Sequence, residues 1–349
     1  MLQIFRPSFT ALFTVLLCGI LLPTSLPVQA QSNRIKATAN ELIEDWSAWM
    51  ERHKITKGAI AIAYNGTPIA SRGIDRTPDD PAPVASLSKS ITAVCTLKLL
   101  QEKGLPPKIR LPKAMPQFFN RFRARDKRLF DITLADLMTH DSGIQTNYIS
   151  REYPKFKTLQ EEQKELQLRH ITRERLENRP GRNNYAYSNA NYLILGAAIE
   201  EISQEDYETY CAKTVLAPLG ITTARLSEEW KVLSAFGGWE ISASDFLTFI
   251  NAYFKDGQIM GQSPTRYSPK VHIGNNRYYG PGVLFRRTDK GALFWHAGSW
   301  RWKTDIIDAR FGAYFLMLDD GLSISINYNH DAFDGQLSEL EEIIWTRTH

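Results

Sequence analysis

The chain has 349 residues, of which 43% are hydrophobic and 23% are charged, an ordinary composition for a globular protein. This length suits two domains, or one large domain with an insertion. The formal net charge of +4 is small and the charges are scattered along the chain, so the sequence gives no reason to expect binding of nucleic acid.

The N-terminus has the pattern of an export signal. Arg6 gives a positive start, residues 9–22 are mostly apolar, and Val28-Gln29-Ala30 offers a small-residue cleavage site. We therefore expect residues 1–30 to be a signal peptide and the protein to be periplasmic or secreted. The alternative is an uncleaved N-terminal membrane anchor, although the apolar run is short for a spanning helix.

Two cysteines, Cys95 and Cys211, follow the predicted signal. They form no Cys-x-x-Cys pair, so neither a metal motif nor a redox motif is predicted. Cys95 lies in an apolar stretch, which favours a small core residue. A disulfide between the two is compatible with export, but their positions in the sequence do not establish it.

The first part of the predicted mature chain alternates helix and strand. Residues 40–53 form an amphipathic pattern typical of a helix, and two short apolar runs, 58–64 and 67–71, flank Asn65-Gly66 as in a β-hairpin. Residues 91–100 are apolar on most sides, which predicts a buried helix. Gly104 and the prolines after it end that helix.

The rest of the chain suggests a sheet domain with a helical insertion. Residues 108–226 are helical and charge-rich in pattern, with a capping box at Thr133-Leu-Ala-Asp136 and a solvated charged face over 158–177. Strands are predicted at 291–295 and 322–327, and a last helix at 336–345. We therefore expect an α/β (α+β) fold, with residues 31–107 and 227–349 forming the sheet domain and residues 108–226 the all-helical insertion.

The sequence Ser86-Leu-Ser-Lys89 opens the buried helix and offers a nucleophile. Positions three apart on a helix share one face, so the Lys89 amine can lie beside the Ser86 hydroxyl. A serine hydroxyl is a weak nucleophile and needs such a base. The alternative is a solvated lysine on a capped helix.

Tyr187-Ser-Asn189 is the second candidate motif. Residues two apart in an extended segment point to the same side, so both side chains can face one cleft. A tyrosine near two cationic groups can have a lowered pKa and relay a proton. The alternative is a packing tyrosine and a capping asparagine in a turn.

His296-Ala-Gly298-Ser299, at the end of a predicted strand, is the third. Glycine permits close backbone approach to a ligand, and the N–H groups of Ser299 and Ser86 would then form an oxyanion hole. His272-Ile-Gly274 has the same spacing but precedes a turn, so we favour His296. The alternative for His296 is a histidine with a purely structural role.

Together and in this order, Ser-x-x-Lys, Tyr-x-Asn and His-x-Gly resemble the serine β-lactamase and penicillin-binding-protein-like superfamily, in particular its class C-like branch. Segments 134–144, 180–189, 217–221 and 237–245 resemble further motifs of that branch. The resemblance implies a β-lactamase/transpeptidase-like fold, in which an antiparallel sheet is flanked by N- and C-terminal helices.

The resemblance also implies an acyl-enzyme mechanism. Ser86 would be the nucleophile, and Lys89 and Tyr187 would share the general-base and proton-relay work. Neither a cofactor nor a metal is implied. The expected partner is a small-molecule or peptide substrate; contact with the cell wall is left open, and the sequence does not specify an oligomeric state.

The remaining predicted site residues would bind substrate. Asn189 would hold substrate and Lys89, His296 would orient substrate or assist Tyr187, and Gly298 and Ser299 would border the oxyanion hole. Several members of the branch have a lysine in place of His296, and that lysine favours a substrate carboxylate. Here Arg301 or Lys303 would have to compensate.

These residues lead us to predict an exported serine hydrolase acting on a small ester, amide or D-amino-acid peptide. His296 in place of a lysine and bulky Trp300 after Gly298 favour this activity over strong β-lactam hydrolysis. The alternatives are a β-lactamase proper and a non-catalytic module that binds the cell wall or a partner. A lipase-type triad is disfavoured because the sequence has no Gly-x-Ser-x-Gly elbow.

Overall fold

The computed structural model describes most of the chain beyond the predicted signal. The described residues are 28–144, 168–169, 171–173, 175–254, 259, 270–289, 291–303, 308–332 and 335–348. Of the predicted signal, only Val28, Gln29 and Ala30 are described, as the first residues of helix α1 (Val28–Arg52). Most of the predicted charged face over 158–177 lies outside the described residues.

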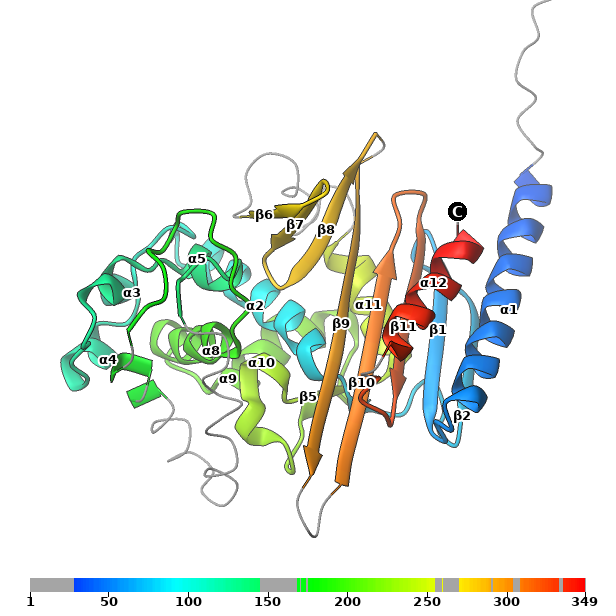
Figure 1. Ribbon diagram of the computed structural model, residues 1–349, viewed down its shortest axis with the longest axis horizontal. Coiled ribbons are helices and arrows are strands. Elements are labelled where there is room, and N and C mark those ends of the chain that lie inside the picture. The colour runs from blue at the N-terminus through cyan, green and yellow to red at the C-terminus, as the bar shows by residue number, and fades with distance from the viewer. Residues whose placement is uncertain are drawn as a thin grey trace, which may run out of the picture.

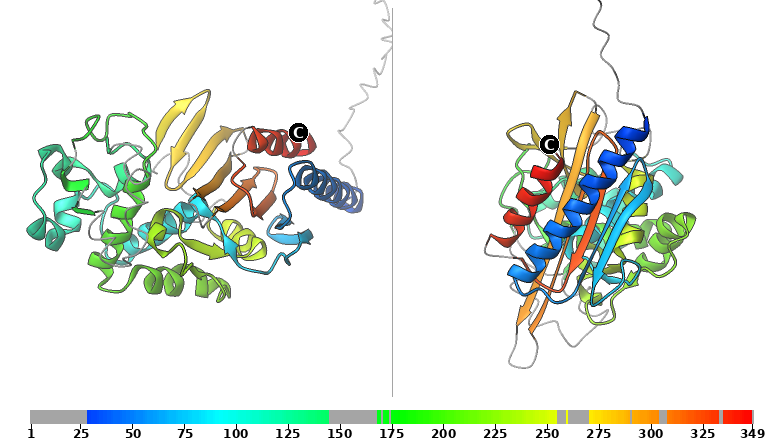
Figure 2. Two further views of the ribbon diagram at one scale, coloured as in Figure 1. Left: turned by 60° about the horizontal axis from the view of Figure 1, so that its bottom comes forward. Right: turned by 90° about the vertical axis from the view of Figure 1, so that its right-hand side faces the viewer.

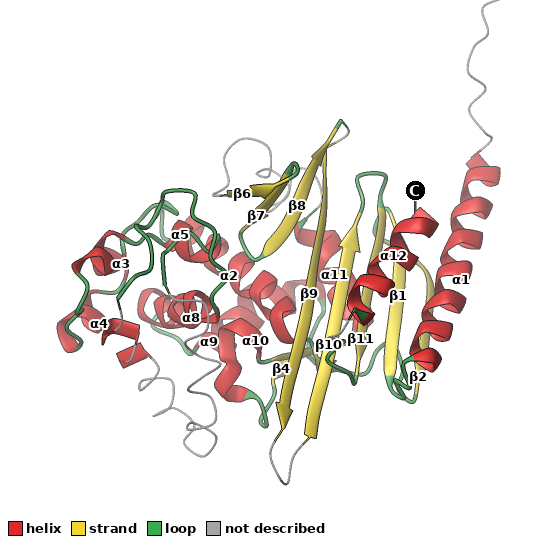
Figure 3. Cartoon of the chain, in the orientation of Figure 1, coloured by secondary structure: helices red, strands yellow, loops and turns green. Residues whose placement is uncertain are grey.

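An eight-stranded antiparallel sheet forms the centre of the fold, as predicted (Figures 1 and 3). Its order is β2-β1-β11-β10-β9-β8-β7-β6. The strands are β1 (Gly58–Tyr64), β2 (Thr67–Ile74), β6 (Val271–Gly274), β7 (Arg277–Gly280), β8 (Val283–Thr288), β9 (Gly291–Lys303), β10 (Asp308–Met317) and β11 (Leu322–Tyr328). The predicted hairpin at Asn65-Gly66 is confirmed, and β9 continues well past the predicted end at Trp295.

Both faces of the sheet are covered, which explains the nearly continuous apolar sequence of β1. Ile60 and Ile62 point to one face and pack with α1 and the C-terminal helix α12 (Gln336–Thr348), whereas Ala59, Ala61 and Ala63 pack in the core on the other face. Figure 2 shows α1 and α12 lying side by side over the first of these faces. Helices α2 (Ser88–Glu102) and α11 (Ala243–Tyr253) contribute to the second core.

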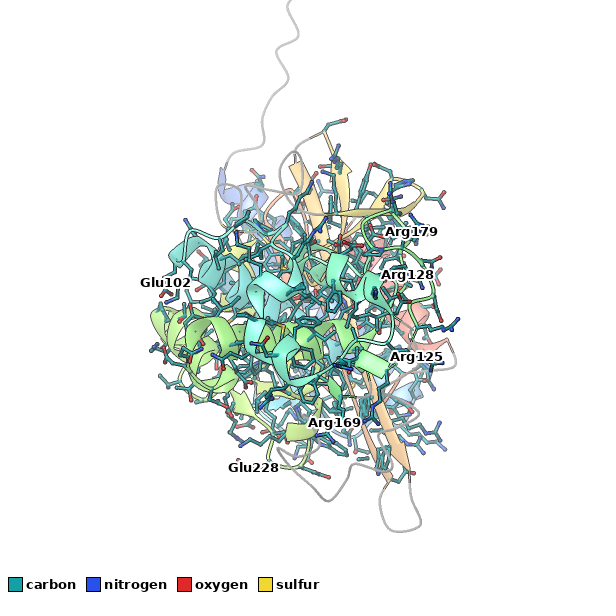
Figure 4. All side chains as sticks on the ribbon, turned by 90° about the vertical axis from the view of Figure 1, so that its left-hand side faces the viewer. Glu102, Arg125, Arg128, Arg169, Arg179 and Glu228 are labelled. Carbon is teal, nitrogen blue, oxygen red and sulfur yellow. A yellow bond between two sulfur atoms is a disulfide. The ribbon has the colours of Figure 1, made fainter. Side chains whose placement is uncertain are left out.

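The helical region lies on the β6 side of the sheet, away from α1 and α12 (Figure 1). Its described helices include α3 (Leu111–Ala114), α4 (Pro116–Arg121), α5 (Leu134–Met138), α8 (Asn189–Ser203) and α9 (Tyr207–Cys211). The predicted capping box is present at α5, where Thr133 and Asp136 bond reciprocally. Charged side chains of both signs are exposed around this region, among them Arg169, Arg179 and Glu228 (Figure 4).

A small three-stranded sheet that we did not predict joins the two parts. It consists of β3 (Ala82–Pro83), β5 (Trp239–Ile241) and β4 (Arg225–Leu226). Strand β3 directly precedes the 3-10 turn η1 (Ala85–Leu87), and the short helix α10 (Ser234–Gly237) precedes β5. These short elements bring Ser86 and Phe236 next to each other, although 150 residues separate them in the sequence.

Cys95 and Cys211, whose pairing the sequence left open, form a disulfide between α2 and α9. Both cysteines are fully buried, so Cys95 is also the core residue that we predicted. The bond ties the helix that carries Lys89 to the helical region across a sequence separation of 116 residues.

Replacing both cysteines with alanine is expected to lower the free energy of unfolding by about 5 kcal/mol. A cross-link that closes a loop of about 100 residues restricts the unfolded chain by roughly that amount. Urea unfolding of the oxidised wild type and of the Cys95→Ala/Cys211→Ala variant measures the difference. The reduced wild type is the control and should unfold at nearly the same urea concentration as the variant. Equal stability of the oxidised protein and the variant would contradict this prediction.

Candidate active site

Ser86 is presented on a tight turn at the entrance to helix α2. The sequence placed Ser86 on the helix itself, whereas the structure places it in η1, and α2 begins at Ser88. Ala85, just before it, has a φ of +46°, a left-handed conformation that is costly for a residue with a side chain. This turn leaves Ser86 half-buried at a cavity while its neighbours Ala85 and Leu87 are buried.

Lys89 lies three residues further on, in the first turn of α2, and its Nζ is 3.0 Å from Ser86 Oγ. The amine also donates a hydrogen bond to the carbonyl oxygen of Phe236 at 2.8 Å. Lys89 is completely buried, and this burial lowers its pKa well below the usual lysine range. A neutral amine in this position has a lone pair that can accept the Ser86 proton.

The Tyr187 hydroxyl lies 2.9 Å from the same Ser86 oxygen. The prediction that two cationic groups lower its pKa is wrong, because burial raises the pKa of Tyr187. Lys89 and His296, two basic groups near Tyr187, are themselves buried: the pKa of Lys89 is lowered, and that of His296 falls to about 3. Tyr187 therefore stays protonated and can donate a proton, or relay one, without first becoming a phenolate.

Asn189 is the first residue of α8 and borders the same cavity. Its Oδ1 atom is buried and has no hydrogen-bond partner among the described residues. We expected Asn189 to hold Lys89, but the Lys89 amine instead bonds Ser86 and Phe236. Asn189 therefore offers an unused acceptor to a substrate N–H or O–H group.

His296 is on β9 as predicted, but the structure does not bring it into the cavity. Its side chain is buried; Nδ1 lies 2.7 Å from the Ala297 carbonyl, and Nε2 accepts a hydrogen bond from the Tyr279 hydroxyl at 3.0 Å. Nothing in the sequence pointed to Tyr279, on β7. His272, the alternative, is exposed on β6 and does not line the cavity.

Gly298 brings the β9 backbone against the turn that carries Ser86. A Cβ atom at this position would lie 2.3 Å from the Val84 carbonyl oxygen and 3.1 Å from the Ser86 nitrogen, so only glycine fits. We predicted that Gly298 allows the backbone to approach a ligand closely. It instead allows β9 to approach the turn that carries Ser86. It places Ser299 at the cavity beside Ser86, while the Ser299 hydroxyl donates to the Asp331 carbonyl. The oxyanion hole formed by the two N–H groups stays a prediction.

The cavity has a volume of about 320 Å³. Its lining residues are Ala85, Ser86, Tyr187, Asn189, Phe236, Gly237, Ser299, Trp300, Arg301 and Trp302. Phe236 was missed at the sequence level; the adjacent Gly237-Gly238 pair, part of the family resemblance, was the available signal. No group of acidic, histidine or cysteine side chains in the described part of the chain is arranged to hold a metal ion.

A serine hydroxyl that meets a buried amine and a protonated tyrosine, on this fold, defines the class of β-lactamase-fold serine hydrolases. Residues 42–331 match the Beta-lactamase family, and the chain belongs to that family.

Within the described residues, no helix is both long and apolar enough to span a membrane.

The chain is similar to known proteins at low sequence identity. The chain is 25% identical over 209 residues to Protein flp of Staphylococcus aureus, and 26% identical over 200 residues to a putative D-alanyl-D-alanine carboxypeptidase of Escherichia coli. Each match covers 56% of this chain, but only 40% and 44% of the respective relative. The octameric penicillin-binding protein homologue of Pyrococcus abyssi superposes with a TM-score of 0.70 at 19% identity, over 88% of this chain and 77% of that one.

Proposed function

We propose that this protein is an exported serine hydrolase that forms an acyl-enzyme on Ser86 and hydrolyses a small ester, amide or D-amino-acid peptide. The observation that carries the proposal is the meeting of Lys89 Nζ and the Tyr187 hydroxyl at one oxygen, Ser86 Oγ. A packed lysine and a packed tyrosine without a catalytic role would have no reason to converge on a serine that borders a cavity.

The chemistry follows from the protonation states. Ser86 Oγ attacks the substrate carbonyl carbon, and its proton passes to the neutral Lys89 amine. The bond from that carbon to the leaving group then breaks, and the leaving group takes a proton from Lys89 relayed through the Tyr187 hydroxyl. Water attacks the resulting Ser86 ester and gives one proton to Lys89, which returns it to the departing serine oxygen.

The size of the cavity and a relative support the substrate class. A volume of about 320 Å³, walled by Phe236, Trp300 and Trp302, suits a small acyl group with apolar substituents. The Escherichia coli relative is described as a putative D-alanyl-D-alanine carboxypeptidase, which makes D-amino-acid peptides part of the proposal. A β-lactamase proper is the second candidate, because the chain belongs to the Beta-lactamase family.

Covalent labelling tests the acyl-enzyme. The intact protein is incubated with a fluorophosphonate and separately with a penicillin probe, and tandem mass spectrometry locates the adduct. We expect a single adduct on Ser86, together with turnover of p-nitrophenyl esters or D-amino-acid peptides in a substrate panel. Hydrolysis of nitrocefin as fast as that of a dedicated lactamase would favour the second candidate. Absence of any Ser86 adduct and of all turnover would favour a non-catalytic binding module.

Arg301 is placed to select substrates with a carboxylate near the scissile bond. It lines the cavity, and its Nε lies 3.5 Å from a carboxylate oxygen of the buried Asp331. We expect Arg301→Leu to lower kcat/KM for a carboxylate-bearing ester by about tenfold to a hundredfold, the usual range for a charged hydrogen bond. The matched neutral ester should change less than about threefold. Equal losses for both esters would show that Arg301 has no part in substrate selection.

Export is part of the proposal and has two supports. Residues 1–30 carry the pattern of a signal peptide, and the Cys95–Cys211 disulfide fits an oxidising compartment. Expression of the whole chain in a Gram-negative host, followed by fractionation and N-terminal sequencing, tests it. Export is supported by periplasmic protein that starts after Ala30, and an N-terminus at Met1 in the membrane fraction would indicate the anchor instead.

A further inference from the structure

The segment after helix α5, residues 139–143, has no part in the chemistry above, yet it lies directly beneath the loop that carries Tyr187. Its sequence is Thr-His-Asp-Ser-Gly, and residues 139–142 are buried even though all four are polar. Buried polar groups need hydrogen-bond partners. Here the partners come mostly from residues 177–191, a stretch that includes Tyr187 and the start of α8.

His140 bonds the residues on both sides of Tyr187. Its carbonyl oxygen accepts the Ala186 N–H at 2.9 Å, and its Nδ1 atom accepts the Ser188 N–H at 3.2 Å. The Asn191 amide nitrogen lies 2.8 Å from the same Nδ1 atom. A backbone N–H can only donate, so Nδ1 must be unprotonated and the proton of the neutral ring is on Nε2.

The ring of His140 also supports the ring of Tyr187 from behind. The two ring centroids lie 4.3 Å apart with a tilt of 38°. His140 is fully buried, and its burial lowers its pKa well below the usual histidine range, in agreement with a neutral ring. Hydrogen bonds before and after Tyr187, together with the ring contact, restrict both the backbone and the side chain of this residue.

Asp141 and Gly143 also contact the loop that carries Tyr187. The Asp141 carboxylate accepts the backbone N–H groups of Asn183 and Asn184, each at 2.8 Å. At Gly143 a Cβ atom would lie 2.3 Å from the Asn178 carbonyl oxygen, so the two segments touch through their backbones. The loop therefore takes its shape from residues 140–143.

We propose that His140 is a positioning residue that holds Tyr187 at hydrogen-bond distance from Ser86 Oγ, through an unprotonated Nδ1 atom that accepts the Ser188 N–H. This role rests on the proposed function, since Tyr187 needs positioning only if it relays a proton to or from Ser86. A shift of about 1 Å in such a group can cost about a hundredfold in rate.

Two substitutions at His140 distinguish the effect of the acceptor atom from the effect of the ring. Asparagine keeps an acceptor, Oδ1, at the place of Nδ1, whereas leucine has nearly the same shape and none. The φ of His140 is +59°, which asparagine tolerates better than leucine does. Thr139→Val serves as the control, because among the described residues the Thr139 hydroxyl bonds only the Ala135 carbonyl, within its own helix turn.

For the activity readout, we expect His140→Leu to lower the acylation rate at saturating ester about a hundredfold, with the half-saturating ester concentration changed less than about threefold. His140→Asn should recover most of that rate, and Thr139→Val should keep it. If His140→Leu does not fold, Asn191→Ala removes one donor to Nδ1 and should lower the rate about tenfold. Wild-type acylation rates in a folded His140→Leu or Asn191→Ala variant, or equal losses in the leucine and asparagine variants, would overturn the proposal.

Hydrogen–deuterium exchange gives a readout that does not depend on activity. The amides of Ala186 and Ser188 should be protected in the wild type and in His140→Asn, and exchange at least tenfold faster in His140→Leu, while the amides of α11 stay unchanged. If the wild type has no activity, the proposed function fails, yet this exchange pattern would still show that His140 holds the loop. Unchanged protection in His140→Leu would refute the positioning role even in an active enzyme.

Discussion

Ser86→Ala is expected to lower ester hydrolysis about a millionfold, leaving only the residual acceleration that substrate binding supplies. Loss of a nucleophilic serine has an effect of this order, because Lys89 and Tyr187 then have no hydroxyl to act upon. The measurement is kcat/KM with a p-nitrophenyl ester and with whichever D-amino-acid peptide the panel identifies.

Ser90→Ala is the matched control for this prediction. Ser90 lies four residues further on, in helix α2, is fully buried, and donates its hydroxyl proton to the Gly282 carbonyl. We expect this variant to retain activity within about threefold, with a modest loss of stability. Ser86→Ala retaining more than about 1% of wild-type activity, after exclusion of contaminating esterases, would assign the nucleophile elsewhere.

Lys89→Arg is expected to lower the acylation rate about a thousandfold or more. The size follows from the usual contribution of a general base, about a hundredfold to ten-thousandfold, and from the crowding of a larger side chain in a fully buried position. Arginine stays positively charged and cannot give up its proton, so it cannot accept the Ser86 proton. Lys89→Met, which has no charge and a similar length, should be equally inactive if the amine acts as a base.

The pH profile of the wild type tests the same residue. Lys89 acts as a base only when neutral, so the rate should fall as the pH drops through its pKa and be fully present above it. Because burial lowers the pKa of Lys89 well below the usual lysine range, the rate should fall only at a pH well below that range. A rate that rises only at the pH where an exposed lysine titrates would contradict a buried neutral amine.

Local patterns in the sequence were sufficient for several elements of the fold. The hairpin at Asn65-Gly66 and the capping box at Thr133 depend on a few neighbouring residues, and both are present. The contact between Ser86 and Lys89 also depends on local geometry, so it could be predicted from their separation of three residues in the sequence. Strand β9 was predicted too short, because its continuation past Trp295 is supported by pairing with β10 rather than by local alternation.

The sequence by itself therefore determined the sheet-and-helix class of the fold, the family resemblance and the residues that meet at Ser86. Only the tertiary structure decided their electrostatics and partners. Burial by distant segments lowers the pKa of Lys89 and of His296 and raises the pKa of Tyr187, which reverses the predicted direction for the tyrosine. Packing also pairs Cys95 with Cys211 and turns His296 toward Tyr279. Such outcomes depend on which groups lose contact with water, and residues far apart in the chain decide that together.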